Sequence, residues 1–282
     1  MTTATPNIAV RRLTAFLDGL DSPDISNPIH STAVAGQYGF KAALVGGVTV
    51  YGWATPPILE VLGDRWLNDG WADAAFRQPV YPGDELTITA TREGDDVASW
   101  QIVNAAGVVC VAGVAGLGSA PFLDQLETPT HLLAEPRPAA LPWLTMEIAP
   151  IGQDLRAMAV PISVEDMEAY VDGKQVDPHP RWRGEGALIH PGWIAARMTP
   201  LLHHSFDYSP AIHTRSQIQH LAPAHAGQTV TVAGRFIDTF VRKNNHYAVL
   251  DGLILAADGT PLVRARHTTI FNVRKLQSEP RA

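Results

Sequence analysis

Two stretches of this 282-residue chain decide its fold: PVYPGDELTITATRE, residues 79–93, and PAHAGQTVTVAGRFI, residues 223–237. Each begins with proline and carries glycine four residues later, and both the prolines and the glycines of the two copies lie 144 positions apart. After each glycine, apolar and polar residues alternate, which is typical of a strand with one buried face. The proline and glycine ahead of the strand predict a turn. The pattern therefore indicates an internal duplication.

The similarity continues on both sides of this strand. Downstream, residues 100–118 and 246–271 each contain two β-rich runs separated by Ala-Gly or Asp-Gly, which predicts a hairpin. Upstream, residues 48–62 and 193–202 are apolar stretches of helix length that follow glycine. Pro56-Pro57 is expected to break or kink the first of these helices. Each half therefore has a helix followed by several antiparallel strands.

Between the halves lies a proline-rich segment. Residues 125–150 contain five prolines and a sixth, Pro121, stands just before them, a composition typical of a linker. We predict an α+β protein with an N-terminal module over residues 1–124, a linker over 125–150 and a C-terminal module over 151–282.

Composition narrows the classes of function. Hydrophobic residues make up 46% of the chain, enough for a sizeable core. With 21 Lys and Arg against 28 Asp and Glu, the net charge of −7 argues against a nucleic-acid partner. A single cysteine, Cys110, excludes an internal disulfide and a cysteine-based zinc site. The N-terminus lacks a signal-peptide pattern, and the most apolar stretch, residues 108–122, is too short to span a bilayer. We expect a cytoplasmic protein with no membrane partner.

The richest set of reactive side chains lies in DISNPIH, which starts at Asp24. His30 can act as a general acid or base near neutral pH, and Asp24 can orient it or share the proton. Asn27 can hold a water molecule or a carbonyl group. Gly46 and Gly47 precede the first helix, where free backbone N–H groups can receive an oxyanion. The alternative is that His30 is only a capping residue or a surface residue of a loop.

These residues carry a family resemblance. Asn27, Pro28, Ile29 and His30, then Gly39-Phe40, then a glycine that opens the helix, resemble the signature of the MaoC-like, or R-specific enoyl-CoA hydratase, family. The turn over residues 79–84 is similar as well, and the resemblance extends over essentially the whole chain. It implies two tandem hot-dog modules, each an antiparallel sheet wrapped round a central helix, that is, a double hot dog.

The chain departs from the family signature at two places. The family aspartate stands five residues before the histidine, where this chain has Ile25, and Asp24 is one residue too early. The histidine that usually precedes the helix glycine is replaced by Val45 or Gly46.

The resemblance implies reversible addition of water across the 2,3 double bond of an acyl thioester, as in fatty acid metabolism. His30 and Asp24 would manage the water and the α-proton, and N–H groups near Gly46 and Gly47 would stabilise the thioester oxygen. No metal or cofactor is implied beyond the acyl-CoA substrate, and the carrier could be CoA or an acyl carrier protein. A homodimer is compatible with the sequence.

Two alternatives stay open. The same fold could carry a thioesterase, in which a carboxylate activates water against the thioester carbonyl. It could also carry a non-catalytic acyl-thioester-binding or scaffold protein, in which the shifted Asp24 marks a decayed site.

Two further groups of residues are candidates. Asp177, His179 and His190 could form part of a site in the second module, because His190-Pro-Gly stands where the family often has His-Gly. Four positively charged residues in the second half of the chain could bind the phosphates of CoA, or could simply lie on a solvent-exposed face of the sheet. These cations are Arg215, Arg242, Lys243 and Arg266.

Overall fold

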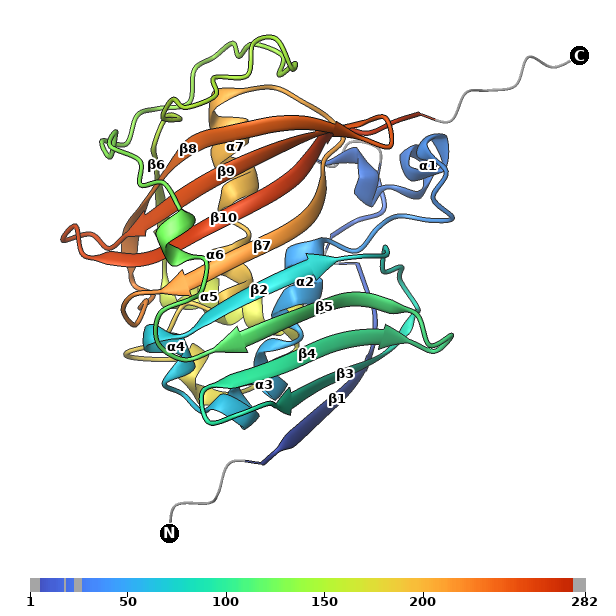
Figure 1. Ribbon diagram of the computed structural model, residues 1–282, viewed down its shortest axis with the longest axis vertical. Helices are drawn as coiled ribbons and strands as arrows, with labels where there is room; N and C mark the ends of the chain where they lie inside the picture. The colour runs from blue at the N-terminus through green and yellow to red at the C-terminus, as the bar shows by residue number, and fades with distance from the viewer. Residues whose placement is uncertain (1–5, 18, 23–26, 276–282) are drawn as a thin grey trace, which may run out of the picture.

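The computed structural model describes residues 6–17, 19–22 and 27–275. In the first half the strands are β1 (Ile8–Thr14), β2 (Trp71–Phe76), β3 (Glu85–Arg92), β4 (Val97–Asn104) and β5 (Val109–Gly116). In the second half they are β6 (Met158–Ile162), β7 (Ile212–His220), β8 (Gln228–Arg242), β9 (Asn245–Leu255) and β10 (Pro261–Asn272). The ten strands form one antiparallel sheet in the order β1-β3-β4-β5-β2-β7-β10-β9-β8-β6 (Figure 1).

The two halves of this sheet have the same strand order when each is read from its outer edge. From the outer edge inwards, this order is the first, third, fourth, fifth and second strand of the half. The second strands of the two halves, β2 and β7, pair with each other in the middle of the sheet. Trp71 pairs with Gln219 and Ala75 with Arg215, so the register is symmetric about the pair Asp73–Gln217. The predicted α+β class with a repeated antiparallel sheet is therefore confirmed.

The turn that opens the third strand of each half explains why the repeated sequence keeps glycine. Gly83 and Gly227 have φ values of 86° and 83°, a left-handed conformation that glycine adopts without strain. The Gly83 N–H donates to the Ala15 carbonyl at 2.8 Å, and the Gly227 N–H donates to the Ile162 carbonyl at 2.7 Å. Each turn thus fixes the first strand of its half beside the third.

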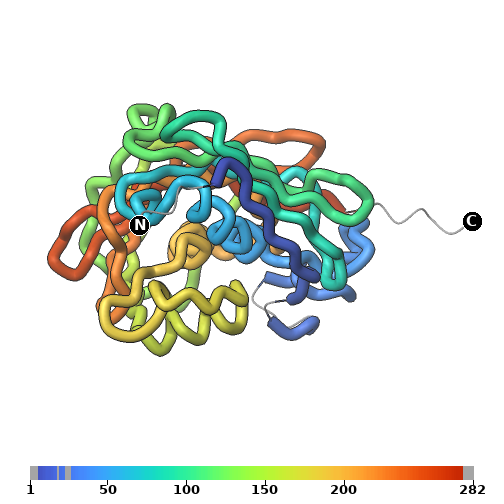
Figure 2. The backbone as a smooth tube through the Cα atoms, turned by 90° about the horizontal axis from the view of Figure 1, so that it is seen from below, coloured from blue at the N-terminus to red at the C-terminus, as the bar shows by residue number. Residues whose placement is uncertain are grey.

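Each central helix is split into two segments. In the first half these are α2 (Gly47–Gly52) and α3 (Thr55–Leu62), and in the second half α6 (Pro191–Ala195) and α7 (Met198–Ser205). Pro56 and Pro57 lie in the first turn of α3, where a missing N–H costs no helical hydrogen bond, so the predicted break is confirmed. Figure 2 shows the helices gathered beneath the sheet, which curls over them.

The remaining helical segments are short. They are α1 (Thr32–Ala35), α4 (Trp66–Asp69), α5 (Val164–Tyr170), the single turns Pro28–His30, Gly36–Tyr38, Leu123–Gln125 and Pro180–Trp182, and a π-type turn over Val171–Gln175. The core between helices and sheet includes the fully buried rings of Trp53, Trp66 and Trp182. Within the described residues, no helix is long and apolar enough to cross a membrane.

The proline-rich segment begins on the face of the sheet opposite the helices (Figure 1) and continues to the end of α7, where the Leu144 N–H donates to the Asp207 carbonyl at 2.8 Å. Arg266 donates to the Gln125 carbonyl at 2.7 Å, and the Glu127 N–H donates to the Asp251 carboxylate at 2.6 Å. The strands of the first half end at Gly116 and those of the second begin at Met158. The division into modules at 125–150 stays a prediction.

Candidate active site

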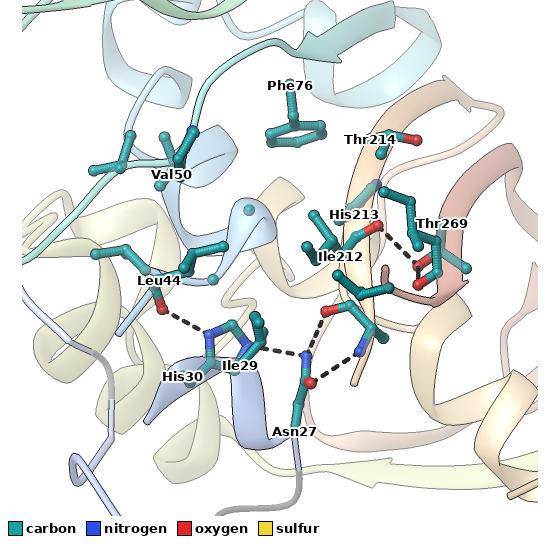
Figure 3. A pocket seen from close by; sticks show the side chains of 18 of the residues that line it. Asn27, Ile29, His30, Leu44, Val50, Phe76, Ile212, His213, Thr214 and Thr269 are labelled. Atoms are coloured by element: carbon teal, nitrogen blue, oxygen red, sulfur yellow. Dashed lines mark hydrogen bonds between the residues drawn. The ribbon is translucent and has the colours of Figure 1, made fainter. Parts of the chain in front are cut away.

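A cavity of about 560 Å³ lies where the two halves meet. The first half supplies the turn at Asn27–His30, the start of α2 and the end of β2, and the second half supplies the start of β7 and the end of β10 (Figure 3). The β8–β9 hairpin adds to the wall from the second half. Most of its wall is apolar. The apolar lining includes Ile29, Phe40, Leu44, Val50, Phe76, Val111, Ile212 and Ile270.

Two histidines of the described residues, His30 and His213, line this cavity, and His30 is the one that lies in the Asn-Pro-Ile-His motif. Its Nδ1 lies 2.7 Å from the Leu44 carbonyl oxygen, and its Nε2 lies 3.3 Å from the Asn27 side-chain nitrogen (Figure 3). A carbonyl oxygen only accepts, so we assign the proton to Nδ1. Nε2 then carries a lone pair, which is the form of imidazole that acts as a general base.

Asn27 holds His30 in place rather than offering a free amide. Its Nδ2 donates to the Ala211 carbonyl at 2.9 Å, and its Oδ1 accepts the Ala211 N–H at 3.1 Å. The second Nδ2 proton points to His30 Nε2. Because Ala211 belongs to the second half, this amide joins the His30 turn to the other half of the chain.

The start of α2 lines the cavity with glycine. Gly46 is the N-cap residue, and its carbonyl accepts the N–H groups of Thr49 and Val50 at 3.0 Å. Among the described residues, no acceptor receives the N–H groups of Gly46, Gly47 and Val48. A Cβ atom on Gly47 would lie 3.3 Å from both the Phe76 ring and the Cβ of His213, so glycine allows this close approach.

The predicted partner of His30, Asp24, lies outside the described residues, and its position is not described. In the described part of the chain, no aspartate or glutamate lines the cavity. The first half thus contributes His30, Asn27 and the backbone N–H groups of α2 as polar groups, and the polar residues from the second half include His213, Thr214 and Thr269.

Three cations lie around the cavity wall. Arg77 follows β2, Lys243 lies in the β8–β9 turn and Arg274 follows β10. All three are exposed, and within the described residues none of them pairs with a carboxylate. Lys243 and Asn244 have φ values of 51° and 60°, as in the two-residue turns that join right-twisted strands.

The other predicted CoA-binding cations lie elsewhere. Arg215 donates to both Asp73 carboxylate oxygens at 2.9 and 2.6 Å, and Arg266 donates to both Asp251 oxygens at 2.6 and 2.7 Å. Arg242 neighbours Lys243 but does not line the cavity. Of the four cations predicted from the sequence, only Lys243 faces the site. Arg77 and Arg274 were not predicted from the sequence, because no local motif marks them.

Comparison with solved structures identifies the fold of this chain. No family model and no curated protein matches the chain. A MaoC-like dehydratase of solved structure covers 88% of this chain and 90% of its own, with a TM-score of 0.57 and 16% identity. A Mycobacterium tuberculosis protein described as having a double hotdog fold matches 87% of this chain and 86% of its own, again with a TM-score of 0.57 and 16% identity. This chain has the double hot-dog fold.

The fold alone does not distinguish between the different reactions that proteins with this fold catalyse. A Lactobacillus plantarum protein described as a candidate oleoyl thioesterase matches 95% of this double hot dog and 97% of its own chain, with a TM-score of 0.51 and 11% identity. Dehydratase and thioesterase chemistry therefore have to be argued from the site.

The second hot dog does not repeat the site of the first. Trp182 occupies the place in the second half that His30 holds in the first, because each is the last residue of a single helical turn. The carbonyl group of the residue before His30 accepts the Leu44 N–H, and the carbonyl group of the residue before Trp182 accepts the Leu188 N–H. His190 stands 144 residues after Gly46, at the start of the second central helix. A tryptophan and a buried imidazole thus occupy the space that the first half leaves open.

The structure brings two of the three predicted second-module residues together. Nε2 of His190 lies 3.9 Å from an oxygen of Asp177, and the Trp182 indole donates to the same oxygen at 2.8 Å. His190 is 0% exposed, and burial lowers its pKa to about 3, so it is neutral and out of reach of a substrate. His179 is exposed and contacts Arg181 instead.

Proposed function

We propose that this double hot-dog protein is a hydratase or dehydratase that adds or removes water at the 2,3 position of an acyl thioester. The observation that carries the proposal is the oriented His30: a half-buried imidazole in the wall of an apolar cavity, with its Nδ1–H held by a carbonyl oxygen and its lone pair on Nε2. An acyl chain needs apolar walls, and its hydration needs one base at one end of them.

In the hydration direction, a water molecule replaces the 3.3 Å contact from Asn27 at Nε2 of His30. Nε2 then removes a proton from this water while the water oxygen bonds to C3 of the enoyl group. The electrons of the double bond move towards the thioester oxygen, which becomes negatively charged. The free N–H groups of Gly46, Gly47 and Val48 stabilise that charge. The protonated His30 then gives up this proton to C2, directly or through the Asp24 carboxyl group, so that both residues return to their starting state.

The cations at the cavity support a polyanionic carrier. Phosphate groups of CoA, or an acidic carrier protein, would meet Arg77, Lys243 and Arg274 at the wall. Guanidinium groups suit phosphate because they offer several N–H donors in one plane.

The double variant Lys243→Ala with Arg274→Ala is expected to raise KM for an enoyl-CoA about tenfold or more, with kcat nearly unchanged. Contacts to the carrier bind substrate and transition state equally, so their loss appears in KM. Arg242→Ala is the matched control, since Arg242 neighbours Lys243 without lining the cavity. Equal KM values for the double variant and the wild type would contradict the assignment of the carrier site.

The reaction itself is tested with crotonyl-CoA and a longer 2-enoyl-CoA, by following loss of the enoyl absorbance and, in parallel, release of free thiol. We expect loss of the enoyl absorbance without thiol. Release of thiol with the double bond intact would show the thioesterase alternative instead. Ligand-induced stabilisation with neither reaction would favour a non-catalytic acyl-thioester-binding role.

A further inference from the structure

A second cavity, of about 540 Å³, lies among α2, α5, α6 and the edge strand β6. It shares only Val48 and Ala196 with the lining of the candidate active site. Its lining is mixed. Val160, Ile162 and Trp193 form an apolar wall, and the polar lining residues are Thr49, Asp166, Tyr170 and two cations, Lys174 and Arg197. A space of this size and mixed lining fits a small organic ligand.

Arg197 is the cation of this cavity that packs against its apolar wall. Its Nε donates to the Trp193 carbonyl at 3.0 Å, and its guanidinium lies 3.9 Å from the centre of the Trp193 ring. No carboxylate in the described part of the chain pairs with it. Asp166 lines the same cavity, but it is already bonded to Ser163 in the cap of α5. Burial lowers the pKa of Arg197 to about 10, so it remains a cation at neutral pH.

The duplication shows that a cation at this place is unusual. Arg197 stands 144 residues after Trp53, and both residues follow the first segment of a central helix. Trp53 is 0% exposed, and its indole donates to the Lys174 carbonyl at 2.8 Å. One half therefore fills the position with a core ring, and the other holds a half-buried cation that no carboxylate in the described part of the chain pairs with. Departures of this kind from a repeated pattern concentrate at functional sites.

We propose that this cavity binds an amphipathic carboxylate, with the carboxylate on Arg197 and a short or medium acyl chain along Val160, Ile162 and Trp193. The planar guanidinium has N–H donors left beyond the Nε bond, and they match the two oxygens of a carboxylate. The apolar wall next to it suits a hydrocarbon chain rather than a bare inorganic anion. The proposal is independent of the hydration reaction, in which Arg197 has no part.

The test measures the dissociation constant of octanoate for the full chain by calorimetry. Octanol, which lacks the charge, and inorganic phosphate, which lacks the chain, are the comparison ligands. Arg197→Met removes the charge and keeps much of the stem, and we expect it to weaken octanoate binding about tenfold or more, as for the loss of a charge-assisted hydrogen bond. Arg65→Met is the matched control, an exposed arginine that pairs with Asp69 outside the cavity.

His30→Ala separates the two cavities, and octanoate should bind this variant as it binds the wild type. Octanoate that binds wild type and Arg197→Met equally, or does not bind the wild type at all, overturns the proposal. Phosphate that binds as tightly as octanoate overturns the assigned ligand class. If Arg197→Met does not fold, Arg197→Lys replaces it, with an expected loss of several-fold because the planar fork is gone.

Discussion

Replacing His30 by alanine is expected to lower kcat/KM for hydration of a 2-enoyl-CoA about a hundredfold or more. The variant loses the Nε2 lone pair that removes the proton from water, and a positioned acid–base group contributes on the order of 10²–10⁴ in rate. The measurement is the rate of loss of the enoyl absorbance over a range of substrate concentrations. Most of the loss should appear in kcat, since the proton moves in the transition state.

His179→Ala is the matched control for this prediction. His179 lies before the helical turn of the second half, is exposed, and does not line the cavity. It should keep full activity. A His30→Ala variant that also keeps full activity would remove His30 from the mechanism and leave the fold assignment intact.

The protein is expected to lose stability steeply on acidification from about pH 6 to pH 4. His190 and His220 are buried and have their pKa lowered by burial to about 3 and about 4, and the pKa of buried His267 is lowered as well, helped by the nearby His213. In the unfolded chain these imidazoles take up protons near pH 6.5. The unfolded state therefore binds more protons below pH 6.5, and stability falls as pH falls.

His190 and His220 are each expected to cost about 2 kcal/mol of the free energy of unfolding at pH 5, on the order of 1.4 kcal/mol per pH unit below 6.5. The burial of His267 acts in the same direction, and the combined loss is a large part of the net stability of a typical domain. Urea unfolding followed by circular dichroism across this pH range measures the effect.

His220→Phe tests the cause of the acid sensitivity. His220 stands 144 residues after Phe76, so the first half already places phenylalanine at the equivalent position. This variant should unfold at a lower pH than the wild type, because one proton fewer is taken up on unfolding. His179→Gln, at an exposed position, should leave the acid transition unchanged. An acid transition that His220→Phe does not move would contradict the role of the buried imidazoles.

Local patterns in the sequence were enough for the strands and turns. Alternation after Gly83 and Gly227 predicts two half-buried strands, and the structure confirms both, with positive φ at both glycines. The break at Pro56-Pro57 was equally local, because proline lacks the N–H that a helix interior uses. His30 and the α2 glycines were found by motif, and their catalytic roles stay proposals.

Contacts between distant residues could not be predicted in the same way. Asn27 binds Ala211, 184 positions away, because antiparallel pairing of β2 with β7 brings the two halves together. Arg77 and Arg274 reach the cavity wall, whereas Arg215 and Arg266 bind carboxylates outside it, and the four look alike in the sequence.

The sequence by itself determined that the chain is a duplication of one α+β module, because period-two alternation and turn glycines act over a few residues. Only the tertiary structure decided that the duplicated sites differ, with His30 beside an open cavity and Trp182 filling its counterpart. Whether equivalent positions leave a cavity or a packed core depends on side chains that meet from both halves. These contacts between the halves depend on strand pairing and on how side-chain volumes pack, which a local sequence pattern does not predict.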